Sequence, residues 1–119
     1  MNARSSETET VIRNHLQAFV TRQGVAAIVS DYDDDACLYG ETATYCGKQE
    51  IGGFFEDFIA NLPPGAIERF ALRSLRVEGD LGYITWSAGQ EIPLGTDTFV
   101  VRDGRIVSQT FAMYVAPTT

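Results

Sequence analysis

Two residues of this sequence, Asp97 and His15, have side chains and surroundings suited to moving a proton. Asp97 lies among apolar and small residues, and enclosure of a carboxyl group raises its pKa, so that it can hold a proton near neutral pH. His15 falls within the apolar stripe of an expected helix, one turn from Val11 and from Phe19. It should therefore point inward. If the two side chains meet, the carboxylate orients the imidazole and they form an acid/base dyad.

Each of these residues also has a plainer interpretation. Asp97 could start a strand at the rim of a sheet and bond only to backbone or water. A lone histidine on an apolar helix face is usually a core residue that bonds one carbonyl group. The sequence leaves both alternatives open.

The segment that must position Asp97 is a hairpin from Gly95 to Tyr114. Asp103-Gly104 is a strong signal for a type I′ turn, which would pair Arg102 with Arg105. Counting outward from that pair assigns the side chains to two faces. The face of Asp97, expected to form a half-open pocket, would also carry Phe99, Val101, Ile106, Ser108, Thr110, Ala112 and Tyr114. The opposite face would carry Thr96, Thr98, Val100, Val107, Gln109, Phe111 and Met113.

Composition excludes several classes of function. The 119 residues suffice for one domain over residues 1–119, and 9 basic against 16 acidic residues give a net charge of −7. Such a charge repels phosphate backbones, so we expect no nucleic-acid partner. No apolar run has the length of a membrane span, which predicts a cytoplasmic protein without membrane contact. One histidine and two cysteines provide no zinc site, and we expect neither metal nor cofactor.

The N-terminal half predicts helices separated by short strands. Residues 1–6 look like a frayed tail, and Ser6 to Glu9 match a capping box for a helix ending near Gln23. A second helix is expected from Val25 to Tyr32, stopped by a turn at Asp33-Asp34-Asp35.

Short strands are expected over 36–40 and 44–46. Cys37 and Cys46 could face each other if the segment between them is a hairpin centred on Glu41-Thr42, but a cytoplasmic location predicts that they stay reduced. Gly47 opens the third helix, which Pro63-Pro64 ends. Its apolar stripe consists of Ile51, Phe54, Phe55, Phe58, Ile59 and Leu62.

The remaining chain is predicted to be strands. We expect a bulged strand over 67–78, a strand over 82–89, and a loop at Pro93 and Gly95 before the hairpin. Helices followed by a long antiparallel sheet predict an α+β domain. Three N-terminal helices would pack on a strongly curved, mainly antiparallel sheet around a cone-shaped interior.

This order of elements resembles the nuclear transport factor 2-like (NTF2-like) superfamily, in its SnoaL-like branch. The resemblance is carried by Y-D-D-D-A-C-L-Y (32–39), G-K-Q-E-I-G-G-F-F (47–55) and T-D-T-F-V-V-R-D-G-R-I-V (96–107). The superfamily includes ketosteroid isomerase, polyketide cyclases, scytalone dehydratase, limonene epoxide hydrolase and binding domains without activity. The resemblance implies an NTF2-like cone and a homodimer formed through the outer face of the sheet.

The resemblance also implies roles for individual residues. Asp97 matches the strand aspartate that is acid or base in SnoaL-type cyclases, and His15 falls where the isomerase has an oxyanion-binding tyrosine. The general base of the isomerase corresponds to Gly40, so that base is missing and Glu41 is the nearest substitute. The expected function is cofactor-independent isomerisation, cyclisation or dehydration of a small hydrophobic molecule. The alternative is a binding or dimerisation module without activity.

Large side chains are expected to line the substrate pocket. Tyr32 and Trp86 are favoured because each combines an apolar body with a polar group. The full set is Tyr32, Tyr39, Phe54, Phe58, Trp86, Phe99 and Tyr114. The outer sheet face, with Thr98, Val100, Val107, Phe111 and Met113, would suit a dimer interface.

Overall fold

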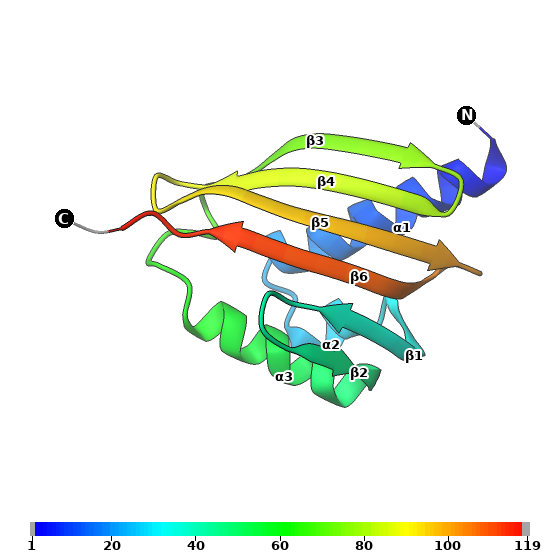
Figure 1. Cartoon of the computed structure of the whole chain (residues 1–119), viewed down its shortest axis with the longest axis horizontal. Coiled ribbons are helices and arrows are strands. Elements are labelled where there is room, and N and C mark those ends of the chain that lie inside the picture. Colours follow the sequence, from blue (N-terminus) through cyan, green and yellow to red (C-terminus); the bar gives the residue numbers. More distant parts are fainter. Residues whose placement is uncertain (1, 118–119) are drawn as a thin grey trace.

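The computed structural model describes residues 2–117 and has three helices on the concave face of one curved sheet (Figure 1). The helices are α1 (Ala3–Val20), α2 (Val25–Val29) and α3 (Gly47–Ala60). The strands are β1 (Tyr32–Tyr39), β2 (Thr44–Cys46), β3 (Phe70–Glu78), β4 (Leu81–Ala88), β5 (Ile92–Arg102) and β6 (Arg105–Tyr114). Their order in the sheet is β2-β1-β6-β5-β4-β3, with β1 and β6 parallel and all other neighbours antiparallel. The predicted α+β architecture is confirmed.

Helix α1 begins earlier than its sequence signals indicated. The side chain of Asn2 accepts a hydrogen bond of 2.8 Å from the backbone N–H of Ser5, and asparagine is among the strongest N-cap residues. Ser5 also accepts a 2.9 Å bond from the N–H of Gly79, which ties the helix to the turn between β3 and β4. The predicted capping box at Ser6 and the frayed tail are therefore wrong, except for residue 1, which lies outside the described residues.

The acidic run after α2 belongs to a strand. Tyr32 was expected in the second helix and the run 33–35 in a turn, but both are part of β1. Tyr32 pairs with Ile106, and the next residue of β1 to pair with β6 is Cys37, opposite Ser108. The acidic residues therefore bulge away from β6, which allows three adjacent carboxylates in one strand.

The turn of the C-terminal hairpin has the predicted form. The φ angles of Asp103 and Gly104 are 53° and 76°, and a type I′ turn requires positive values at both positions. Arg102 opposes Arg105, as expected.

A bulge in β6 changes the faces of that hairpin. Val101 opposes Ile106 but Val100 opposes Ser108, so Val107 is skipped. One inserted residue moves every later side chain to the other face of the strand. The predicted faces are therefore wrong beyond the bulge. Gln109, Phe111 and Met113 share the concave face with Asp97, whereas Ser108, Thr110, Ala112 and Tyr114 lie on the convex face.

The remaining strands fit the predictions in part. The bulge expected in β3 is present between Leu72 and Ser74. The loop expected at Pro93 and Gly95 is absent, because both residues belong to β5. The ladder between β4 and β5 is irregular beside Pro93, and a strand tolerates proline where it makes no ladder bond.

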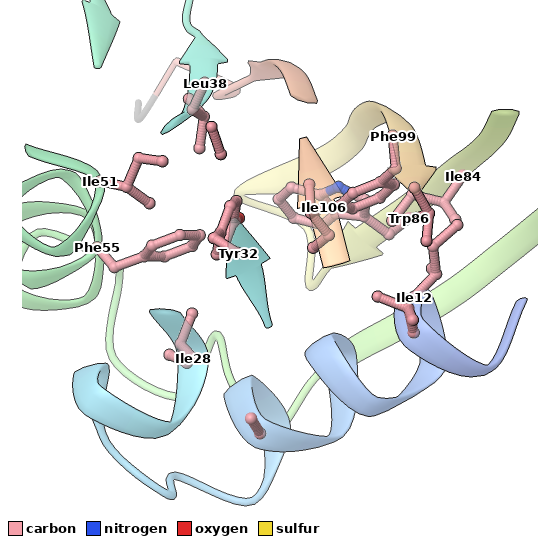
Figure 2. Packing of buried hydrophobic residues seen from close by; sticks show 14 of the residues in the cluster. Ile12, Ile28, Tyr32, Leu38, Ile51, Phe55, Ile84, Trp86, Phe99 and Ile106 are labelled. Atoms are coloured by element: carbon pink, nitrogen blue, oxygen red, sulfur yellow. The ribbon is translucent and has the colours of Figure 1, made fainter. Parts of the chain in front are cut away.

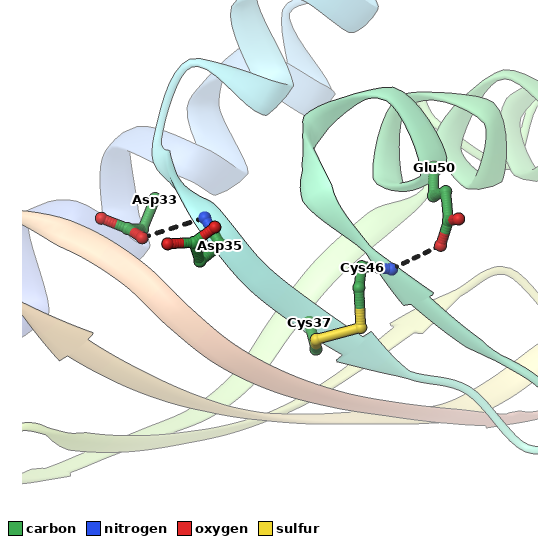
Figure 3. The surroundings of a disulfide bond; sticks show 5 residues. All are labelled: Asp33, Asp35, Cys37, Cys46 and Glu50. Carbon is green, nitrogen blue, oxygen red and sulfur yellow. Dashed lines mark hydrogen bonds between the residues drawn. A yellow bond between two sulfur atoms is a disulfide. The ribbon is translucent and has the colours of Figure 1, made fainter.

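Cys37 and Cys46 form a disulfide (Figure 3). They are directly opposed in the β1–β2 hairpin, which was expected, but the prediction of reduced thiols is wrong. Cys46 precedes α3, and its N–H donates a 2.8 Å hydrogen bond to Glu50 in the first turn of that helix. The disulfide thus connects β1 to the start of α3.

The core lies between the helices and the concave face of the sheet (Figure 2). Ile12 of α1, Ile51 of α3 and Phe99 of β5 are fully buried there. The predicted inward stripe of α3 is confirmed, since its residues belong to the core cluster or pack against it. Among the described residues, no helix combines the length and apolar character needed to cross a membrane.

Candidate functional site

A buried carboxylate held by two neutral donors forms the centre of the site. Asp97 of β5 is 7% exposed. Its Oδ1 accepts a 2.8 Å hydrogen bond from the indole Nε1–H of Trp86 on β4, and its Oδ2 accepts a 2.7 Å bond from the amide Nε2–H of Gln109 on β6. The three adjacent strands therefore fix the orientation of the carboxyl group.

Gln109 connects this carboxylate to a buried tyrosine. Its Oε1 accepts a hydrogen bond from the hydroxyl of Tyr32 on β1, so the amide group is used on both sides. Burial raises the pKa of Tyr32 well above its usual value, and the negative charge of Asp97 raises it further. Tyr32 therefore remains a neutral donor at physiological pH.

Burial changes the acidity of Asp97 itself. Loss of solvent raises its pKa to about 6, while the hydrogen bonds from Trp86 and Gln109 oppose that shift. Among the described residues no cation pairs with the carboxylate, whose partners are an indole and an amide. Asp97 is therefore a carboxyl group that exchanges its proton near neutral pH.

His15 of α1 points inward as predicted and is 4% exposed. Its ring makes edge contacts with Tyr32, Phe55 and Phe99, with centroids 5.5, 5.7 and 5.6 Å away. Burial lowers its pKa to about 4, and the backbone at Ile28 opposes that shift only in part. Its Nδ1 atom has no hydrogen-bond partner among the described residues. The imidazole is therefore neutral at pH 7.

Asp97 and His15 line one cavity of about 40 Å³ between α1, α3 and the sheet. The described residues include no direct hydrogen bond between them: the Asp97 oxygens bond to Trp86 and Gln109, and His15 Nδ1 has no partner. The cavity that they both line has room for one or a few waters. The remaining lining residues are Leu16, Phe19, Phe54, Phe55, Phe58, Trp86, Gln109 and Phe111.

An apolar groove of about 340 Å³ lies beside this cavity. Phe54 and Phe58 of α3 and Phe111 of β6 line both spaces. The rings of Phe54 and Phe58 are stacked with centroids 5.8 Å apart, and the ring of Phe111 stands edge-on to both. These three rings form the partition between the groove and the buried carboxylate.

The other predicted pocket residues differ in whether they line the cavity, lie buried behind it or are exposed on the convex face. Phe54, Phe58 and Trp86 line the cavity. Tyr32 and Phe99 are fully buried behind it, against His15.

Tyr39 and Tyr114 are 48% and 55% exposed on the convex face, so neither lines the cavity, and the prediction that Tyr114 shares the face of Asp97 is wrong. Glu41 is exposed and lies outside the cavity lining, which leaves the position of Gly40 without a substitute carboxylate in the cavity.

Gln109 and Phe111 were missed as site residues. The error in register placed both on the outer face of the sheet. Phe111 carried a signal, because a large aromatic side chain in the last strand of a small domain is more often buried than exposed. Gln109 carried none, since its importance comes only from the groups that it joins.

The described residues contain no group of three or more histidine, cysteine, aspartate or glutamate side chains placed to hold a metal ion. The acidic run of β1 is exposed or half-exposed and points away from the cavity. The chemistry that the cavity itself supports is proton transfer by the carboxyl group of Asp97.

The sequence profile of the SnoaL-like domain matches residues 12–109, which include His15, Trp86, Asp97 and Gln109. No curated protein sequence is similar enough to count as a match.

Solved structures share the fold at low sequence identity. An NTF2-like protein of unknown function from Mesorhizobium loti is 23% identical, with a TM-score of 0.78 and 96% of each chain covered. A candidate ketosteroid isomerase from Kribbella flavida is 15% identical, with a TM-score of 0.73, over 97% of this chain and 83% of the other. A candidate polyketide cyclase from Sinorhizobium meliloti is 16% identical, with a TM-score of 0.70, over 87% and 94%.

Proposed function

We propose, from the premise that this chain belongs to the SnoaL-like domain family, that it catalyses cofactor-independent acid/base chemistry on a small hydrophobic carbonyl compound. The observation that carries this proposal is the environment of Asp97. Its carboxylate is buried, bonds only to neutral donors and borders a cavity with phenylalanine walls. A base with a pKa of about 6 is well matched to proton transfer near neutral pH.

In the proposed reaction Asp97 removes a proton from a carbon next to the carbonyl group. The C–H bond breaks, its electron pair forms the carbon–carbon double bond of an enolate, and the carbonyl π electrons move to oxygen. Asp97 then returns the proton to another carbon. This sequence accounts for isomerisation, and the same enolate can begin an aldol-type cyclisation or a dehydration.

His15 would bind the carbonyl oxygen in this reaction. A neutral imidazole carries one N–H, so the proton would have to lie on Nδ1, the nitrogen without a partner among the described residues, and not on the nitrogen that faces the backbone at Ile28. A neutral donor placed there stabilises an enolate without supplying a full charge. The low pKa of His15 supports this role, because the ring would not compete with the substrate for the proton on Asp97.

The test is conversion of a β,γ-unsaturated cyclic ketone to its conjugated isomer, followed by ultraviolet absorption. Asp97→Asn should lower the rate by about a hundredfold, since general acid–base catalysis is worth that order. Asp103→Asn is the matched control, because it makes the same chemical change at an exposed turn residue. Equal rates for Asp97→Asn and the parent protein would rule out Asp97 as the base.

The second candidate function is a binding module without activity. The small size of the cavity, about 40 Å³, and the missing carboxylate at Gly40 favour it. In that case the ketone would bind without conversion, and Asp97→Asn would change only its affinity.

We also propose that the protein forms a homodimer through the convex face of the sheet. Large exposed apolar residues on this face support the proposal. Phe111 and Met113, which were expected to contribute to this interface, lie on the concave face instead. Sedimentation velocity would show a single species of monomer mass if the proposal is wrong. The exposed residues are Tyr39, Leu81, Tyr83, Leu94 and Tyr114.

A further inference from the structure

The disulfide between Cys37 and Cys46 lies at the edge of the sheet and reaches the surface of the protein. Cys46 is the last residue of β2, a short edge strand, and it is exposed. Cys37 is half-buried in β1, which lies between β2 and β6. Exposed disulfides are in general more easily reduced than buried ones. A small thiol in solution can therefore reach this bond from the side of Cys46.

The backbone around the disulfide does not depend on it. Cys37 and Cys46 are directly opposed in an antiparallel ladder that has two further residue pairs. The N–H of Gly40 donates a 2.8 Å hydrogen bond to the carbonyl oxygen of Ala43, which closes the turn of this hairpin. The bridge has a sequence separation of only 9, so it restricts the unfolded chain less than a long-range bridge would. In the reduced protein the two thiols would therefore remain close enough to form the bond again.

The two sulfur atoms differ in their electrostatic surroundings. Cys46 is the N-cap residue of α3, and in the disulfide its sulfur accepts no capping hydrogen bond among the described residues. The first N–H groups of a helix lack partners within the helix, and they stabilise a thiolate placed at this end. Cys37 lies within a strand and has no such donors near its sulfur from a helix end of its own. Cys46 is therefore the cysteine that more readily becomes a thiolate once the bond is reduced.

The charged side chains near Cys46 act in both directions. Lys48, in the first turn of α3, brings an ammonium group, and its Nζ lies 3.6 Å from Oδ1 of Asp34. Glu50 brings a carboxylate, whose Oε1 accepts a 2.8 Å hydrogen bond from the Cys46 N–H (Figure 3). Charges at the surface are screened by water and salt, whereas the N–H groups of the helix act through direct hydrogen bonds. The helix end therefore outweighs these charges.

We propose that Cys46 and Cys37 form a reversible thiol–disulfide pair, in which Cys46 exchanges with low-molecular-weight thiols and disulfides and Cys37 resolves the mixed disulfide. The exposure of Cys46, its place at the start of α3 and its direct opposition to Cys37 carry the proposal. It goes beyond the function proposed above and does not depend on it. Because the bond joins β1 to the start of α3, the redox state of the pair sets how firmly that helix is attached to the sheet.

Oxidation of the pair takes two exchange steps with a small disulfide, RS–SR. The Cys46 thiolate attacks one sulfur of RS–SR, so the RS–SR bond breaks, a Cys46–SR bond forms and RS⁻ leaves. The Cys37 thiolate then attacks the sulfur of Cys46 and releases the second RS⁻. Two electrons pass from the protein to the small disulfide, and the two protons of the protein thiols end on the two RS⁻ ions. Reduction by two small thiols follows the same steps in reverse.

Reversibility is tested on the parent protein in the absence of denaturant. Reduced glutathione at millimolar concentration should open the bond, and oxidised glutathione should restore it, as counted by the free thiols in mass spectrometry. The indole N–H resonance of Trp86, the only tryptophan, shows that the protein stays folded. A bond that glutathione opens only after a denaturant is added would be a structural cross-link and would overturn the proposal.

The different roles of the two cysteines are tested by partial alkylation of the reduced, folded parent protein at pH 7. Iodoacetamide is added in limiting amount, and fragmentation in the mass spectrometer locates the modified residue. We expect Cys46 to react at least about tenfold faster than Cys37, because more of it is thiolate and it is more accessible. Equal rates, or a faster reaction of Cys37, would overturn the assignment of Cys46 as the exchanging sulfur.

Two matched variants, Cys37→Ser and Cys46→Ser, test the resolving step. With oxidised glutathione, Cys37→Ser should accumulate a mixed disulfide at Cys46, because no second thiol is present to release it. Cys46→Ser should form at least about tenfold less mixed disulfide in the same time, and the parent protein should end as the internal disulfide. Accumulation of a lasting mixed disulfide in the parent protein would rule out Cys37 as the resolving thiol. Each of these results is independent of whether the protein converts a ketone.

Discussion

In the Asp97→Asn variant, the free energy of unfolding should rise by about 3 kcal/mol from pH 4 to pH 6.5. In the parent protein it should stay nearly constant over the same range. The rise comes from His15, whose pKa is about 4 in the folded protein and 6.5 when the side chain is free in water. Below pH 6.5 the unfolded chain binds a proton at His15 that the folded protein rejects. The contribution of the His15 side chain to the free energy of unfolding is therefore fully present above pH 6.5 and is lost as the pH falls through 4.

In the parent protein Asp97 cancels this rise. Its pKa is raised from 3.8 to about 6 on folding. The contribution of Asp97 to the free energy of unfolding is therefore fully present below pH 3.8. This contribution, about 3 kcal/mol, is lost as the pH rises through 6. The two groups act in opposite directions over nearly the same interval, so the parent curve should be almost flat there.

The experiment is urea unfolding at a series of pH values for the parent protein, Asp97→Asn and His15→Phe. His15→Phe should show the opposite slope, with stability falling from pH 4 to pH 6. Differences between each variant and the parent remove the contribution of other carboxylates, such as Asp31, whose pKa burial also raises. Parallel curves for all three proteins would show that neither group has a perturbed pKa.

Gly95→Ala should lower the free energy of unfolding by about 3 kcal/mol, near the upper end for overpacking in a core. An added Cβ would lie 2.1 Å from Cε2 of the Trp86 ring. That ring has little room to move, because it stacks against Phe70 and Phe111 at centroid distances of 5.4 and 6.4 Å. Its N–H is also held by Asp97.

Gly53→Ala is the matched control for this change. A Cβ at Gly53 would meet no atom within 4 Å, and the residue lies inside α3. Alanine there should raise the stability by about 0.5–1 kcal/mol, because it favours the helix more than glycine does. If Gly95→Ala cost less than about 1 kcal/mol, the Trp86 ring would have found another position, and its indole N–H resonance would shift.

Local patterns predicted the elements around the site but not their register. The turn at Asp103-Gly104 and the inward position of His15 follow from residues close together in sequence, and both are confirmed. The bulge at Val107 has no comparable signal, because it depends on which strand lies on the other side of β6. That single residue decides whether Gln109 or Ser108 faces Asp97.

Pairing between distant parts of the chain also explains other differences between the predicted and the observed structure. Tyr32 continues a helical pattern with Val25 and Val29, yet it forms a strand because Ile106, far along the chain, pairs with it. The composition suggested a cytoplasmic protein, and this is why Cys37 and Cys46 were expected to stay reduced instead of forming a disulfide. The hairpin that places the two residues opposite each other can be inferred from the local sequence.

The position of β6 in the sheet has a consequence for synthesis on the ribosome. Of the six strands that the structure describes, β6 is made last, yet it lies between β1 and β5 and joins the two halves of the sheet. Until it emerges, β1 and β2 have no connection to the β3–β5 ribbon, and the apolar faces of α1 and α3 lack the middle of the surface on which they pack. A nascent chain stalled before residue 105 should therefore remain open, expose apolar surface and depend on chaperones.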